Sequence, residues 1–268
     1  MRVDSLSGMI LGFALCAVVC TGIEARYSLQ GRHSYANRGS DWAYWPISAL
    51  FIGNLTRAFI FGALIVLAGT LQAADPFSEA LRWIHEVNPL PFHAWPKPVQ
   101  FLVALGIGDF IGYWSHRLRH TRWLWPFHAI HHAPRTLDWV SAVRMHPIDD
   151  GIDNVAVGLA LLLMGFSFEV WSWIGPFLLF FNAWLHLDVS WDLGALRGWV
   201  ASPRFHRTHH ERGRNVNFAG VFPVWDRLFG TYALGPNPTR FGVEESVPEG
   251  VLAGWWWPIR RIAGLGSR

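Results

Sequence analysis

The chain has 268 residues, which lies within the range of a single domain. Only 15% of its residues are charged, against roughly 25% in an average soluble domain, while 51% are hydrophobic. With a net charge of only +3, this composition excludes a disordered, a collagen-like or a nucleic-acid-coating protein. Seventeen Trp and thirteen His suggest a membrane protein with polar chemistry at its edge. The only cysteines, Cys16 and Cys20, lie in the first apolar segment and form no thiolate metal motif.

Four apolar segments follow one another along the chain, at 8–23, 45–71, 98–114 and 155–187. A helix needs roughly 20 residues to cross the hydrocarbon core, so we predict an all-α integral membrane bundle of about four to five spans or half-spans. The first segment also suits a signal peptide, but no clean cleavage site follows it, and we expect it to be retained. Glu169, Gly175 and Pro176 interrupt the last segment, which we predict to be a helical hairpin that turns around 167–169.

The predicted hairpin matters because histidine-rich segments precede and follow it, and they share one site only if the chain returns to the same side. Arginines gather in both of these segments, at 116–146 and 197–227. By the positive-inside rule, the histidines form a cytoplasmic helical cap. The C-terminal run 255–257 of three Trp, followed by Arg260 and Arg261, predicts an interfacial anchor.

We therefore divide the chain into N-terminal membrane helices (1–97), a histidine-bearing catalytic domain (98–232) and a C-terminal tail (233–268).

Ten of the thirteen histidines form short motifs. They are His116, His120, His128, His131, His132, His146, His186, His206, His209 and His210. On a helix, residues at i, i+3 and i+4 share one face, so each motif directs its rings to one side. We take the other three, His33, His85 and His93, as ordinary core or surface residues.

Eight to ten imidazoles exceed the three or four ligands of one zinc ion and imply two metals. Imidazole suits Zn, Fe, Cu and Ni, so the ligand type does not select the metal. Two metals held by neutral nitrogen ligands keep a high positive charge, which suits the binding and reduction of O2.

Two other classes of function remain open at this point. A metal transporter or other metal-handling protein would also need histidines, although these ligands gather at the ends of the apolar segments and not in their middle. A zinc-dependent membrane hydrolase would also need them, but the chain has neither HExxH nor a GxSxG motif.

The motifs resemble those of the fatty acid hydroxylase and sterol desaturase superfamily over about residues 100–232. They are HxxxH at 116–120, HxxHH at 128–132 and 206–210, and the stretch WDRLFGT at 225–231. The resemblance implies a di-iron centre that uses O2 to hydroxylate or desaturate a C–H bond of a lipid, which is a sterol, a fatty acyl chain or a related isoprenoid. It also implies a separate electron donor of the ferredoxin or cytochrome/reductase type, and a purified or resting form can carry Zn²⁺ instead.

The resemblance further implies roles for individual residues. The eight histidines of the three main motifs match the catalytic ligands, His186 matches a ligand that joins them, and His146 stands where a further ligand or near neighbour often lies. Asn182 replaces the first histidine of an HxxxH motif found in some fatty acid hydroxylases, so it either ligates a metal or orients a neighbour.

Carboxylates are the remaining candidates, as groups that orient the ligands. Asp109 lies at the end of an apolar segment, where a charged residue suggests function. For Asp226 the alternative is pairing with a nearby Arg. The further carboxylates are Asp138, Asp149, Asp150, Asp153 and Asp188. We expect a protein of the bacterial inner membrane that binds the bilayer and a lipid, and no nucleic acid.

Overall fold

The structure is a computed structural model that describes residues 5–31, 38–48 and 92–265, together with isolated positions between 58 and 90. All regular elements among these residues are helical, which confirms the predicted all-α fold class. His33, His85 and most of the predicted apolar segment 45–71 lie outside the described residues.

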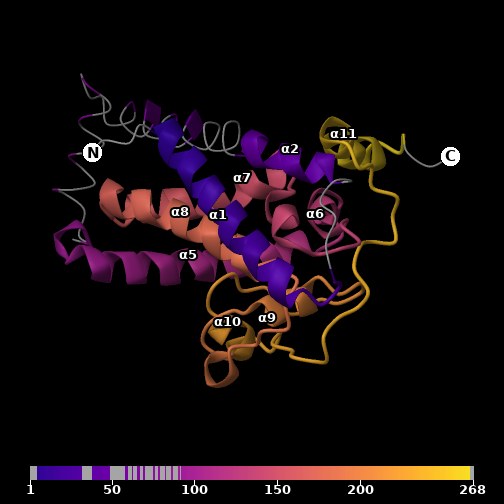
Figure 1. Cartoon of the computed structure of the whole chain (residues 1–268). Helices are drawn as coiled ribbons and strands as arrows, with labels where there is room; N and C mark the ends of the chain where they lie inside the picture. Colours follow the sequence, from indigo (N-terminus) through magenta and orange to yellow (C-terminus); the bar gives the residue numbers. More distant parts are fainter. Residues whose placement is uncertain are drawn as a thin grey trace.

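Three long helices dominate the fold, and shorter ones lie beyond one end of them (Figure 1). The α-helices are α1 (Ser5–Tyr27), α2 (Gly39–Ile47), α5 (Lys97–Arg119), α6 (Trp125–His132), α7 (Pro147–Leu163), α8 (Phe168–Leu185), α9 (Pro203–His209), α10 (Val224–Leu228) and α11 (Val251–Ile262). Short 3-10 turns are η4 (Phe92–Ala94), η5 (Trp139–Val143) and η6 (Gly194–Leu196). The long helices α1, α5 and α8 cross the molecule, and α9 and α10 form a separate lobe below them in this view.

Helix α5 is the centre of the packing, because both α7 and α8 lie against it. Gly108 allows the close approach of α7, since a Cβ at this position would lie 3.2 Å from a methyl group of Val157. Buried Leu161, Phe166 and Val170 fill the space near the turn between α7 and α8.

The predicted hairpin of the fourth apolar segment is confirmed. Helix α7 ends at Leu163 and α8 begins at Phe168. Gly165 makes this short turn possible, because its φ of +76° is one that residues with a Cβ rarely adopt. The turn lies slightly before the predicted position, and it brings the histidines that follow α8 back to those that precede α7.

Among the described residues, no helix combines the length and the sustained hydrophobicity of a membrane crossing. The predicted membrane bundle of four to five spans or half-spans therefore stays a prediction.

The C-terminal helix α11 packs against α6 and α2. Its three consecutive tryptophans differ in orientation. The Trp255 indole donates a hydrogen bond to the Met145 carbonyl (3.0 Å), whereas Trp256 is 61% exposed. The tail therefore also contributes to the packing around the end of α6.

Candidate metal centre

Nine of the ten histidines in the predicted motifs meet at one end of the bundle. Helices α5, α6, α8 and α9 supply them, and three of the histidines are C-caps, namely His120, His186 and His210. The HxxHH motif of α6 is buried, and so is that of α9. Helix α6 packs against α5, α7 and α11, and α9 packs against α8.

The first group contains five histidines, whose ring nitrogens lie within 4.8 Å of one another. They are His116, His120, His128, His132 and His209. The Nε2 atom of His128 lies 3.1 Å from that of His116 and 3.2 Å from that of His132. The Nε2 atoms of His132 and His209 are 3.1 Å apart.

The second group contains the four histidines His131, His186, His206 and His210, which are all buried. The Nε2 atom of His210 lies 3.0 Å from that of His206 and 3.1 Å from that of His131. The ring of His210 also stacks on that of His132 in the first group, with centroids 4.2 Å apart. The two groups are therefore direct neighbours.

Hydrogen bonds on the Nδ1 atoms, which point away from the centre of each group, show which ring nitrogen carries the proton. Nδ1 of His116 donates to the Phe218 carbonyl and Nδ1 of His209 to the Val216 carbonyl, both at 2.8 Å. Nδ1 of His186 donates to the Asn182 carbonyl at the same distance. A neutral imidazole with its proton on Nδ1 has a lone pair on Nε2. The inner Nε2 atoms therefore face one another as acceptors, and such lone pairs repel unless a cation lies between them.

The spacing of these nitrogens fits metal ions. Nitrogen ligands about 2.1 Å from an ion and at right angles to one another are about 3.0 Å apart. The observed Nε2 separations are close to this value, for example 3.0 Å between His206 and His210. Nε2 of His120 is buried and has no hydrogen-bond partner among the described residues, so it is free to bind an ion. The two groups could therefore hold one metal ion each.

Burial keeps these imidazoles neutral. It lowers the pKa of His120 to about 4 and lowers the pKa values of His128, His131 and His209 far below the ordinary value, and neighbouring imidazoles lower the last three further. Because a metal competes with protons for the same lone pairs, low pKa values favour metal binding at neutral pH.

His146 is the predicted site histidine that lies outside both groups. It is the N-cap of α7, where its Nδ1 accepts a hydrogen bond from the Ile148 amide (3.0 Å). Its Nε2 donates to the Trp255 carbonyl of α11 (3.1 Å). Helix α7 begins at Pro147, directly after His146. The His146 ring therefore caps the start of this helix and belongs to neither histidine group.

Asn182 contacts the site through its backbone. Its carbonyl accepts the hydrogen bond from Nδ1 of His186, while its side-chain amide donates to the Ala142 carbonyl (2.8 Å). Of the two roles that the sequence leaves open, the structure places Asn182 where it orients a neighbouring histidine.

Asp109 and Asp226 both hold the backbone segment that follows the second HxxHH motif. Asp226 accepts from the amides of Phe218 and Ala219 (2.7 and 2.8 Å), and Asp109 accepts from those of Val221 and Phe222 (2.7 Å each). The Phe218 carbonyl in turn accepts the Nδ1 proton of His116. Both carboxylates therefore act on a ligand through this segment. Among the described residues Asp226 forms no ion pair with an Arg, which was the alternative that the sequence left open.

Two further side chains contact histidine rings of the first group directly. The Asp149 carboxylate accepts from Nδ1 of His128 (3.0 Å) and pairs with buried Arg119 (3.2 Å). The Asn215 amide oxygen contacts Nδ1 of His120 (3.0 Å). In the sequence Asp149 is one of several aspartates. Its position three residues after His146 does not distinguish it from the others as a partner of a histidine. Nothing in the sequence points to Asn215.

Comparison with known proteins agrees with the resemblance found in the sequence. The family model described as fatty acid hydroxylase matches residues 101–231. Ornithine lipid hydroxylase OlsE of Rhizobium tropici is 36% identical over 63% of this chain and 54% of its own length. Alkylglycerol monooxygenase of Danio rerio is 32% identical over 55% of this chain and 33% of its own length.

Methylsterol monooxygenase 1-3 of Arabidopsis thaliana is 26% identical over 82% of this chain and 72% of its own length. The chain therefore spans about half of the ornithine lipid hydroxylase and a third of the alkylglycerol monooxygenase. No solved structure matches it significantly.

Proposed function

Because residues 101–231 belong to the fatty acid hydroxylase family, we propose that the chain is a membrane-bound di-iron oxygenase that hydroxylates or desaturates a C–H bond of a lipid. The observation that carries this proposal is the pair of adjacent groups of five and four histidines, seven of them buried, in which neighbouring Nε2 atoms lie 3.0–3.3 Å apart. Two neighbouring metal ions with nitrogen ligands suit the reduction of O2, whereas one hydrolytic zinc ion needs only about three ligands.

The five-histidine group and the four-histidine group would each hold one iron ion. Together the ions would supply the redox chemistry by which R–H, O2, two electrons and two protons become R–OH and H2O. Iron is supported by the family and is compatible with the imidazole ligands, and Zn²⁺ would fit the same nitrogens in a resting form.

The protein's own contribution is to hold neutral ligands in a dry site. Backbone carbonyls keep the protons on the Nδ1 atoms of His116, His186 and His209, so Nε2 points inward in each. The aromatic ring of Phe218 covers one side of the five-histidine group, with its centroid 5.1 Å from that of His120 and 5.7 Å from that of His209. Such a cover limits water at the place where a C–H bond would react.

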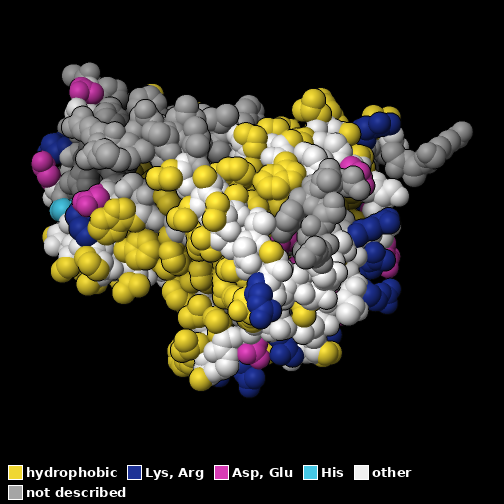
Figure 2. Space-filling model, in the orientation of Figure 1, with side chains coloured by type: hydrophobic (Ala, Val, Ile, Leu, Met, Phe, Trp, Pro, Cys, Tyr) yellow, Lys and Arg dark blue, Asp and Glu magenta, His cyan; other side chains and the backbone are white. Residues whose placement is uncertain are grey.

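A lipid substrate is supported by the names of the relatives, which act on an ornithine lipid, alkylglycerols and methylsterols. It is also supported by apolar surface. Exposed large hydrophobic residues line three long helices, namely Leu11, Leu15 and Val18 of α1, Val99, Leu102 and Phe110 of α5, and Trp173 and Leu178 of α8. Figure 2 shows hydrophobic side chains gathered over these helices. Surfaces of this kind favour contact with a membrane.

The orientation and the electron donor complete the proposal. We propose that the histidine groups face the cytoplasm, because the arginines gather around them, and that α11 rests at the membrane interface with Trp256, Arg260 and Arg261. The two electrons would come from a separate protein of the ferredoxin or cytochrome/reductase type.

Metal analysis combined with turnover tests the proposal. The purified full chain is loaded with Fe²⁺, supplied with a reductant system, and offered an ornithine lipid, an alkylglycerol and a methylsterol under ¹⁸O2. We expect about two iron ions per chain and either ¹⁸O in a lipid product or a new double bond. The variants His131→Ala and His209→Ala should abolish turnover.

The same experiment separates the alternatives. Product that forms equally well without O2 would support a zinc hydrolase. Metal uptake into vesicles that hold the protein, without any lipid product, would support a metal transporter. Full activity without iron would overturn the proposal.

A further inference from the structure

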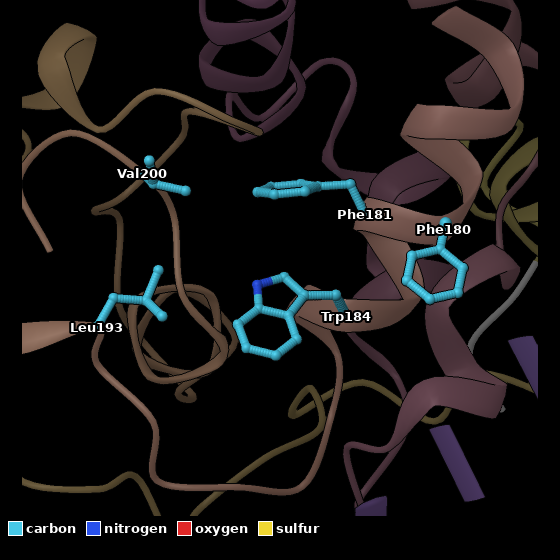
Figure 3. A pocket seen from close by; sticks show the side chains of 5 residues that line it. All are labelled: Phe180, Phe181, Trp184, Leu193 and Val200. Carbon is cyan, nitrogen blue, oxygen red and sulfur yellow. The ribbon is translucent and has the colours of Figure 1, made fainter. Parts of the chain in front are cut away.

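An apolar groove lies beside the histidine groups, at the C-terminal end of α8. Phe180, Phe181 and Trp184 of α8 form one wall, and Leu193 and Val200 form the other. In Figure 3, Phe181 and Trp184 point across a gap toward Leu193 and Val200. The indole N–H of Trp184 is turned to the Ala201 carbonyl (3.4 Å), so the wall presents only carbon to the groove.

The size of the groove fits one hydrocarbon chain. Its volume is about 280 Å³, slightly below the roughly 300 Å³ at which ordinary small-ligand pockets begin. It has no polar lining, so a sugar, a nucleotide or a peptide backbone would find no hydrogen-bond partner in it. A rigid sterol ring system would need a wider space than a single acyl chain.

Two exposed arginines lie in or against the segment 193–200, which forms one wall of the groove. Arg197 lies between Leu193 and Val200 in the chain, and its side chain is exposed. The Arg227 guanidinium lies over Gly198, where one of its nitrogens would be 2.6 Å from an added Cβ. Neither arginine belongs to an ion pair within the described part of the chain. Asp192, the acid nearest to Arg197 in sequence, is already paired with Arg204 (3.3 Å).

The surface around these arginines is itself apolar. Leu196 and Trp199 accompany Arg197, and Leu228 follows Arg227; these three are 57%, 61% and 67% exposed. Figure 2 shows basic and hydrophobic side chains next to one another on the lobe that carries α9 and α10. Exposed Trp and Leu with interspersed Arg are typical of a surface that meets lipid headgroups.

We propose that this groove binds one acyl chain of an anionic membrane lipid, whose phosphate group is held by Arg197 and Arg227. The apolar wall selects the chain, and the unpaired guanidinium groups select the negative headgroup. The bound lipid would lie next to the histidine groups, since Phe181 packs in the same cluster as Phe205 and Phe218. This binding does not require the proposed oxidation to be correct.

Native mass spectrometry of the delipidated full chain tests the site. The protein is titrated with phosphatidylglycerol and with phosphatidylcholine that carry identical acyl chains. We expect one phosphatidylglycerol to bind at least about tenfold more tightly than phosphatidylcholine, because each arginine near a phosphate contributes a several-fold preference. The double variant Arg197→Gln/Arg227→Gln should bind both lipids equally, and Val200→Trp should weaken both.

Two matched controls make the result specific. Arg122→Gln/Arg240→Gln removes the same charge from exposed positions elsewhere and should keep the preference. Leu102→Trp fills a second apolar hollow, lined by Phe101 and Trp173, and should leave binding unchanged. Equal binding of the two lipids by the unaltered protein, an unchanged preference in Arg197→Gln/Arg227→Gln, or unchanged binding of both lipids by Val200→Trp would overturn the proposal. Lipid binding can be measured on metal-free protein. Its result is therefore independent of whether the oxygenase proposal is correct.

Discussion

The two histidine groups differ in what holds their outer nitrogens. Three rings of the five-histidine group contact one short segment, through Asn215, Val216 and Phe218, and a fourth contacts the Asp149 carboxylate. In the four-histidine group, the carbonyls of Arg144 and Asn182 accept from His131 and His186. One group therefore depends on a loop and an ion pair, and the other on backbone at the ends of helical elements in the core.

Because of this difference, two metals bound in the two groups would occupy sites that are not identical. A carboxylate that accepts from a ligand imidazole increases the ring's basicity and fixes its orientation. Asp149 gives this support to His128 in the five-histidine group. The four-histidine group has one histidine fewer, so an ion bound there would have more open coordination positions. We therefore expect the two groups to respond differently when a single residue is changed.

The largest difference should follow from the loss of one ligand in each group. His210→Ala would leave three ligands in the four-histidine group, whereas His120→Ala would leave four in the five-histidine group. We expect His210→Ala to lower the iron content from about two toward one ion per chain, with activity reduced by at least about 100-fold. His120→Ala should retain more metal. Elemental analysis after gel filtration measures both, and equal losses would contradict the proposed asymmetry.

The Asp149 carboxylate offers a smaller change that is confined to one group. Asp149→Asn keeps the shape of the side chain but removes the charge that faces His128 and Arg119. We expect the metal affinity of the five-histidine group to fall by about 10–100-fold, while the other group keeps its metal. Competition with a chelator measures the two affinities.

A matched control separates this effect from the loss of an ion pair. Asp153 also pairs with Arg119 but contacts no ligand ring in the part of the chain that the structure describes. Asp153→Asn should therefore leave both metal affinities unchanged. If it weakens the five-histidine group as strongly as Asp149→Asn does, the effect belongs to Arg119 and not to His128.

A still smaller effect is expected from Asp226, because it contacts the backbone of the segment 216–219 and not a histidine ring. Asp226→Asn weakens the hydrogen bonds to the Phe218 and Ala219 amides and so loosens the segment that holds His116 and His209. We expect a several-fold loss of metal from the five-histidine group alone, and a loss of about 1–3 kcal/mol in the free energy of unfolding. Chelator competition and chemical denaturation measure these changes. A loss of metal from the four-histidine group instead would show that the segment serves both.

The histidine groups can be predicted from the sequence because the histidines of each motif are only a few residues apart. The spacings of His128, His131 and His132 and of His206, His209 and His210 fix which side of a short helix each ring takes. The interrupted apolar segment 155–187 likewise predicts a hairpin, and the hairpin brings His186 to the other ligands. The helical fold class and the assembly of nine histidines therefore follow from short-range patterns.

The partners of the rings do not follow from such patterns. The Phe218 and Val216 carbonyls belong to the backbone, which every residue carries, so no side chain marks them. Asn215 and Asp149 reach their rings across 95 and 21 residues, a relation that depends on the tertiary fold. The place of Arg227 is equally absent from the sequence pattern, because it is distant in the chain from the segment 193–200 and its guanidinium reaches Gly198 only in the folded structure.

His146 should show the smallest effect, and it tests most directly which histidines belong to the two histidine groups. Its ring caps α7 and donates to α11, so His146→Ala should leave the iron content unchanged. The loss of the helix cap should lower the free energy of unfolding by about 1 kcal/mol, which corresponds to about 2–4 °C in Tm for a chain of this size. Differential scanning calorimetry and elemental analysis of the same preparation give both values, with His186→Ala as the variant that should lose metal. A loss of iron in His146→Ala that matches His186→Ala would make His146 a tenth ligand, recruited by a movement of α7 toward the four-histidine group.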